Sequence, residues 1–241
     1  MKKIALILSL IFLSSLSLNA EDPLSLEQIE TMIKAEAEKQ VAPVLDLFTS
    51  GLNSGIYAPV SGKILSFGIQ FNAVSIKNEG VLKDIDLSVL PLPFAYLGIR
   101  IPAFGINAFF RGIGFPYEGK TMKIIGFGAG WEPTFIPVIS IKMLIHYHML
   151  RDFPFIDVNS IGGTIIGALT AIPLVTPYAT LGLNNTSLTT KGLKAMGTSE
   201  EFTMDNTAFL LGVGLKLLKV VTAEVQFIPA MTYSLSLGLS F

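Results

Sequence analysis

The sequence predicts an all-β protein: an antiparallel, up-and-down transmembrane β-barrel of about ten strands that follows an N-terminal amphipathic helix. Three observations predict this class. The chain of 241 residues is 51% hydrophobic and only 15% charged, and its mean hydropathy is +0.60, which is high for a soluble domain. From Ser61 onward, apolar residues alternate with small or polar residues. Several alternating runs reach about nine to eleven residues, the length at which a tilted strand crosses a bilayer.

Charge and cysteine content narrow the classes of partner. The formal net charge is -1, so the chain has no basic face for nucleic acid and no acidic tail for a cationic partner. We therefore expect membrane lipid as the partner and no nucleic acid. The chain has no cysteine, which excludes disulfides, thiol catalysis and thiolate zinc sites. We also expect no cofactor.

The first 20 residues have the layout of a secretory signal peptide. Lys2 and Lys3 precede an apolar run over residues 4–18, which is followed by "LNA" and then by the acidic pair "ED". Cleavage is expected after Ala20, so that the mature protein is exported. The alternative is that residues 4–18 stay in place as a membrane anchor.

Residues 21–60 are predicted to form an amphipathic periplasmic helix and a linker. Ser25 and Gln28 make a capping box, and an apolar stripe follows at helical spacing. The stripe consists of Ile29, Met32, Ile33, Val41 and Leu45. Pro43 is expected to interrupt the helix, and "TSGLNSG" to form a short flexible linker. The helix could cap the periplasmic mouth of the barrel, lie on the membrane, enter the lumen or bind a partner, and we expect the cap.

Residues 61–241 are predicted to form the barrel itself. Strands that cross lipid must close into a barrel, because an open edge would leave backbone amides unpaired in hydrocarbon. The rival interpretation is an α-helical membrane protein, since residues 161–177 are almost free of charge. Glycines, threonines and Pro173 within that run disfavour a transmembrane helix.

The connections between the predicted strands alternate in length, as expected for a transmembrane barrel with long loops on one side. The long connections are residues 74–90 and 184–204, while the short ones include 101–102, 132–135 and 218–219. This parity predicts about ten strands, long loops outside the cell and both termini in the periplasm. The strands near residues 157–170 have the weakest pattern, so that strand numbers of eight and twelve are kept as alternatives.

The chain ends on "MTYSLSLGLSF", a strict alternation closed by an aromatic residue. This ending resembles Gram-negative outer-membrane β-barrel proteins, in which the last strand is read by the barrel-assembly machinery. The resemblance implies an outer-membrane location, the assembly machinery as partner, and an assembly signal. The signal would comprise Tyr233, Leu235, Leu237, Leu239 and Phe241.

Longer segments extend this resemblance over most of the mature chain. They are "APVLDLFTSGLNSGIYAP", "LPLPFAYLGIRIP", "IIGFGAGWEPTFIPVISIKM" and "FLLGVGLKLL". They resemble an uncharacterised family of bacterial outer-membrane barrels, known as a domain of unknown function. This family implies fold and location, and carries no assigned activity.

Eleven polar residues fall on the predicted inner face of the strands. They are Gln70, Asn72, Arg100, Asn107, Arg111, Lys142, His146, His148, Lys216, Glu224 and Gln226. Most of the charged ones are positive, which would favour anions in an open pore. We expect instead a hydrogen-bonded network that fills a narrow barrel.

The motif "KMLIHYH" is the best candidate for chemistry, because it places His146 and His148 on one face of a strand. The sequence places no third ligand beside them, so we expect no metal site. Ser140 shares the face of His146, but six residues along a strand separate them by roughly 20 Å, too far for a nucleophile and its base. We therefore expect no catalytic site, and an outer-membrane hydrolase is a remote alternative.

Two functions fit this barrel. The first is a narrow conduit or carrier for small or apolar molecules. The alternative is a structural or adhesive envelope protein with a closed barrel. A wide diffusion pore is disfavoured, since it needs about sixteen strands.

Overall fold

The computed structural model describes residues 26–62, 64–77, 79, 82, 88–117, 120–133, 138–153, 156–172, 174–190 and 203–241. Among these, it describes the side chain of residue 39 and, with a few gaps, those from residue 41 onward. The predicted signal peptide lies outside these residues. Helices α2 (Leu26–Asn53) and α3 (Tyr57–Val60) precede the strands. The strands are β1 (Leu65–Ser75), β2 (Val89–Ile101), β3 (Ile106–Tyr117), β4 (Lys120–Trp131), β5 (Ile139–Arg151), β6 (Ile156–Leu169), β7 (Val175–Thr190), β8 (Thr203–Leu217), β9 (Val221–Ile228) and β10 (Thr232–Ser240).

The ten strands form a closed antiparallel barrel, which confirms the predicted fold class and strand number. Each strand pairs with its neighbours in the chain, and β1 pairs with β10 to close the sheet. At this seam Ile64 N donates to the carbonyl oxygen of Phe241 at 2.6 Å. Closure gives every strand two partners, so that the sheet has no open edge.

The alternation of the sequence corresponds to the two faces of the barrel wall. On β10, Tyr233, Leu235 and Leu237 point outward and are about half exposed, while Ser234 and Ser236 between them are buried. Most strands follow the same rule, since successive side chains of a strand point to opposite faces. The outer face of the barrel is therefore apolar.

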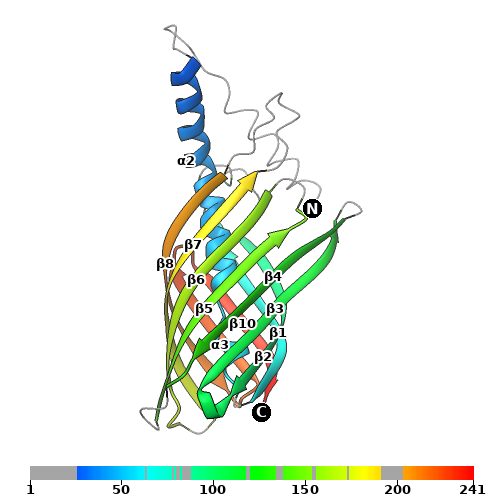
Figure 1. Ribbon diagram of the computed structural model, residues 1–241, viewed down its shortest axis with the longest axis vertical. Helices are drawn as coiled ribbons and strands as arrows, with labels where there is room; N and C mark the ends of the chain where they lie inside the picture. The colour runs from blue at the N-terminus through cyan, green and yellow to red at the C-terminus, as the bar shows by residue number, and fades with distance from the viewer. Residues whose placement is uncertain are drawn as a thin grey trace.

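The two ends of the barrel differ. At one end, here called the turn end, β2 joins β3 through the one-turn helix η2 (Pro102–Phe104), and β8 joins β9 through residues 218–220. Leu65 and Phe241 lie at this end too (Figure 1). At the other end, the loop end, lie the two longest connections, residues 76–88 and 191–202, as the parity argument predicts, together with the shorter connections at 118–119, 152–155 and 229–231.

The strands β7 and β8 are longer than expected. The sequence predicts a loop from residue 184, but β7 continues to Thr190 and β8 begins at Thr203. Asn185 pairs with Thr207, and Ser187 with Asp205. The outward residues in this part of the hairpin are polar, because the hairpin extends beyond the apolar part of the outer wall. The apolar pattern in the sequence therefore stops before the strands end.

Helix α2 lies inside the barrel, where the prediction placed a cap at the mouth. Figure 1 shows α2 entering from the loop end and running down within the strands toward α3. It contacts β1, β2, β5, β6, β7 and β8. Pro43 lies within the continuous helix, and the packing of the helix inside the barrel offsets the cost of its missing hydrogen bond, which is about 3 kcal/mol.

The segment predicted as a flexible linker is part of this buried core. Residues 51–60 are all buried, and Thr49 to Asn53 belong to α2. A Cβ atom on Gly51 would collide with Leu92 and lie 2.8 Å from Val74 Cγ2, so that a larger residue here would force these wall side chains to shift. Gly55 has a φ of +68°, which turns the chain from α2 toward α3.

The loop-end half of the lumen is an apolar core around α2. Val41, Val44 and Leu45 of the helix pack inside the wall. The wall residues of this lumen core include Leu92, Phe94, Ile124, Leu150, Val158, Leu188 and Met204. Without α2, these side chains would face a void or water, so the helix is part of the barrel core.

Among the described residues, neither helix combines the length and apolar character needed to cross a bilayer.

Candidate functional site

The eleven predicted polar residues lie inside the barrel. Ten of them are buried, and Arg100 is half-buried at the turn end. Asn107 donates to the nearby backbone oxygen of Gly105, and Gln226 donates to that of Ile228. The others form two groups: a middle cluster around the C-terminal end of α2, and a turn-end cluster below it.

Arg111 is the centre of the middle cluster. Its side chain is fully buried and donates to the carbonyl oxygens of Leu52 and Ser54, the latter at 2.7 Å. The last carbonyls of a helix have no partner within the helix and carry its partial negative charge, so a cation is well placed there. The guanidinium also lies 4.8 Å from the centre of the Phe94 ring. Arg111 therefore binds the end of the helix to the wall.

His148 joins the same cluster in a defined tautomer. Arg111 Nε donates to His148 Nε2 at 2.9 Å, so Nε2 must accept. His148 Nδ1 then carries the hydrogen and donates to Asn53 Oδ1 at 3.1 Å. Asn53 Nδ2 donates in turn to Ser160 Oγ at 2.9 Å. The imidazole is thus neutral and fully used as a connector between helix and wall.

Two amide side chains of β1 also bind carbonyls at this helix end. Asn72 Nδ2 donates to Gly51 O at 2.7 Å, and Gln70 Nε2 donates to Ser54 O at 3.1 Å. Gln70 also donates to Asn72 Oδ1 at 2.6 Å. Buried carbonyls that lack partners are costly, so these amides contribute to keeping α2 in the lumen.

Glu224 on β9 completes the middle cluster. Its carboxylate accepts from Gly55 N at 3.1 Å and from Tyr178 Oη at 3.1 Å. The Tyr178 ring packs on Tyr57 of α3, with centroids 4.1 Å apart. A buried carboxylate is stabilised by such donors, and Glu224 thus binds the turn that follows α2.

The turn-end cluster contains an ion triad. Glu132 binds Lys142 and lies 3.1 Å from Arg100 Nη2, while Ser140 Oγ donates to it at 2.6 Å. Burial alone would raise the pKa of Glu132, but the charge and hydrogen bond of Lys142, the bond from Ser140 and the charge of Arg100 hold that pKa below its ordinary value.

Lys216 lies near this triad but bonds to neutral oxygens. Its Nζ donates to Ser61 O at 3.1 Å and to Ser240 Oγ at 2.8 Å. It thereby joins the segment after α3 to the end of β10.

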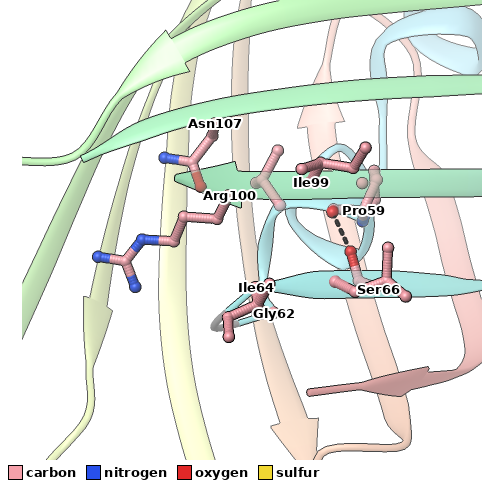
Figure 2. Close-up of a pocket in the computed structure, with 10 residues that line it drawn as sticks. Pro59, Gly62, Ile64, Ser66, Ile99, Arg100 and Asn107 are labelled. Atoms are coloured by element: carbon pink, nitrogen blue, oxygen red, sulfur yellow. Dashed lines mark hydrogen bonds between the residues drawn. The ribbon is translucent and has the colours of Figure 1, made fainter. Parts of the chain in front are cut away.

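A small pocket lies at the turn end, between α3 and the first strands (Figure 2). It comprises about 130 Å³ of space between atoms, part of it open to solvent, and is too narrow for a water molecule. Ten residues line it, among them Pro59, Ser66, Arg100 and Asn107. In Figure 2, the hydroxyl of Ser66 on β1 binds the carbonyl of Pro59, which fixes α3 to the wall. A pocket of this size is smaller than a typical ligand site.

The histidine motif is engaged in structural bonds. The His146 and His148 rings lie 5.2 Å apart, and His146 Nε2 bonds to Thr164 Oγ1 at 2.9 Å. Ser140, considered above as a nucleophile, bonds to Glu132. Within the described part of the chain, no three His, Cys, Asp or Glu side chains are grouped in a way that could hold a metal ion.

Several residues of these clusters were missed in the sequence. Asn53 and Ser54 stood in the predicted linker, and Glu132 in a predicted turn. Tyr57 and Tyr178 carried no signal as a pair. The strand register could have indicated Glu132, because Trp131 pairs with Met143 and the next positions along the hairpin are Glu132 and Lys142, which form an ion pair.

The matches to known proteins come from solved structures. No protein-family model matches the chain, and a search of curated proteins finds no match. Two solved structures of Ail, the attachment invasion locus protein of Yersinia pestis, are similar. The first is 13% identical, covers 73% of this chain and 96% of its own, and has a TM-score of 0.35. The second, in complex with the heparin analogue sucrose octasulfate, is 11% identical, covers 72% and 93%, and has a TM-score of 0.31. At these identities and TM-scores, neither likeness supports a conclusion about this chain.

Proposed function

We propose that the protein is an outer-membrane β-barrel whose lumen is closed by its own helix. The protein anchors its loop end in the envelope and is not an open conduit. The observation that carries this proposal is the pair of bonds from Arg111 to the carbonyls of Leu52, in the last turn of α2, and Ser54, just after it. These bonds join the part of the chain that fills the lumen to the barrel wall.

The membrane location is supported by the outer face. Large apolar side chains point outward all around the barrel, and Phe71, Ile145, Leu181 and Phe209 are each more than half exposed. Soluble proteins rarely expose apolar patches larger than a few hundred Å², whereas a bilayer covers such a belt. Short turns in the periplasm and long loops outside are the usual orientation, and it places the turn end in the periplasm.

The closed lumen argues against the conduit predicted above. The middle cluster and the lumen core fill the space between α2 and the wall, from mid-height at Arg111 to the loop end at Met204. Withdrawal of α2 would leave the Arg111 charge buried without its carbonyl partners and would expose the apolar wall. Removing the partner of a buried charge costs about 3 to 5 kcal/mol, before the lost apolar contacts are added.

The assembly signal is part of the proposal. The C-terminal strand pairs with both β1 and β9, and its outward residues Tyr233, Leu235, Leu237, Leu239 and Phe241 are accessible on the outer face. An accessible terminal strand is what the barrel-assembly machinery would need to bind. We propose lipid and this machinery as partners.

Planar-bilayer recording of the full-length protein tests the closed state. We expect no steady current from protein that is shown to be inserted by its heat-dependent mobility on a gel. Reproducible single-channel steps from the same preparation would contradict the proposal and favour the conduit.

A further inference from the structure

We infer that the chain passes through its own barrel, so that the amino-terminal end of α2 is presented on the cell exterior. The direction of α2 relative to the loop end comes from the structure, and the assignment of that end to the exterior rests on the proposed orientation. The expectation from the sequence was the opposite, since it placed the helix and both termini in the periplasm.

Contacts along α2 follow the barrel axis in order. After the helix, Pro59 and Ser61 bind Ser66 and Lys216 at the turn end. The last turn of α2 lies at mid-height, where Leu52 accepts from Arg111. Proceeding backward along the helix, each contact then lies nearer to the loop end.

The next contacts reach the loop end itself. Ser50 Oγ accepts from Ala230 N at 2.8 Å, and Ala230 lies in the turn between β9 and β10. Asp46 accepts from Asn206 at 2.9 Å, three residues into β8 from its loop-end start. Because an α-helix rises 1.5 Å per residue, the residues before Val41 extend about 20 Å further in the same direction.

The longest strands of the wall, β6, β7 and β8, support the helix as it leaves the lumen. Val158, Leu188 and Met204 lie near the loop ends of β6, β7 and β8 and pack in the lumen core with Val41 and Val44. On the other face of the same hairpin, Asn185 and Asp205 point outward and are polar and exposed. This part of the wall thus stands in water beyond the apolar belt, and α2 leaves the barrel beside it (Figure 1).

This path gives the barrel a second use: it holds its own amino-terminal segment at the surface. The bonds of Arg111, Asn72 and Glu224 fix the far end of the helix, so the projecting end is carried on a rigid rod. The loops and the projecting helix then form one face toward the outside.

Cysteine labelling in intact cells tests the path, and the absence of native cysteine removes background. The test variants are Lys39→Cys and Ala42→Cys, both at exposed positions of α2. Asp205→Cys marks the loop end and Lys219→Cys marks the turn end. A membrane-impermeant maleimide is the probe, a periplasmic protein reports on leakage, and heat-dependent gel mobility confirms that each variant is folded.

We expect the two α2 variants to label as strongly as Asp205→Cys, and Lys219→Cys to label only after the outer membrane is permeabilised. If Asp205→Cys labels but both α2 variants label only after permeabilisation, the inferred path is wrong while the barrel orientation stands. If Lys219→Cys labels in intact cells and Asp205→Cys does not, the orientation under the proposed function is wrong, and exterior presentation is wrong with it.

Discussion

Arg111 Nη1 on β3 donates to the carbonyl oxygen of Ser54 at 2.7 Å, although the two residues are 57 positions apart in the chain. This bond joins the end of α2 to the barrel wall at mid-height. Both groups are buried, so water does not replace the bond when it is lost. The structure therefore makes the lumen helix and the barrel one folding unit.

The first prediction concerns this bond. Arg111→Met should lower the free energy of unfolding by about 3 kcal/mol, because it leaves the carbonyl of Leu52 without its donor, removes one of the donors to Ser54 O, and removes charged hydrogen bonds. The measurement is the urea midpoint of the folded gel band in lipid vesicles. Lys123→Met is the control, since the Lys123–Asp152 pair is exposed at 3.5 Å and should contribute less than about 1 kcal/mol. Equal losses in the two variants would contradict a structural role for Arg111.

The second prediction tests the close approach of helix and wall. Gly51→Ala should destabilise the barrel by about 1 to 3 kcal/mol, because the new methyl group meets Leu92 and Val74, although alanine favours helices. Adding Leu92→Ala should recover part of the loss by making room. Gly167→Ala is the matched control, because no atom lies within 4 Å of its added Cβ. A stabilising Gly51→Ala would show that α2 does not contact β2 as described.

The third prediction is a pH dependence. The pKa of Glu132 lies below its ordinary value, so the ionised carboxylate stabilises the folded state above the unfolded pKa. That stability is lost as pH falls through the lower, folded pKa. The urea midpoint should therefore fall with pH below the ordinary glutamate range, and Glu132→Gln should weaken this dependence while lowering stability at neutral pH. An unchanged pH profile in Glu132→Gln would exclude Glu132 as its source.

The fourth prediction concerns the outer face. Leu235→Arg should reduce the folded yield and cost about 2 to 4 kcal/mol if Leu235 faces lipid near the midplane. Thr207→Arg, outward on β8 but near the loop end, should cost less than about 1 kcal/mol. Refolding yield into vesicles measures both. Similar costs at the two positions would argue against a lipid belt around the barrel.

The barrel itself could be predicted from the sequence because lipid and lumen demand different side chains on alternating positions. The final strand shows this best, since Leu235 and Leu237 face outward and Ser234 and Ser236 face inward. The parity of loop lengths also predicted the strand number, because successive connections of an up-and-down barrel lie at alternate ends. The ends of β7 and β8 could not be predicted, because strands that leave the lipid lose the apolar signal while their pairing continues.

The position of α2 was missed although the sequence holds a signal for it. In the run from Leu90 to Leu97, residues of both parities are apolar or proline, and Leu92 and Phe94 point inward. Phe109 is a similar inward apolar residue, with its ring 6.4 Å from that of His148. An inner wall of this kind is not suited to water, and it indicates that an apolar segment fills the lumen.

The polar clusters could be predicted only in part. The pattern identified which wall residues point inward, but their partners come from α2, whose depth and rotation the pattern does not fix. Asn53 is the clearest case, because it bonds to both His148 and Ser160 from a segment that the sequence indicates as a linker.

Cross-linking of α2 to the wall tests the central claim most directly. Asp46 and Asn206 are joined by a hydrogen bond of 2.9 Å, so Asp46→Cys with Asn206→Cys should react with a short bis-maleimide in native membranes. Asp46→Cys with Lys219→Cys is the control pair, because Lys219 lies at the turn end. We predict an efficient cross-link for the first pair, seen as a mobility shift on a denaturing gel, and none for the control. A folded barrel in which the first pair does not cross-link would contradict a helix inside the lumen.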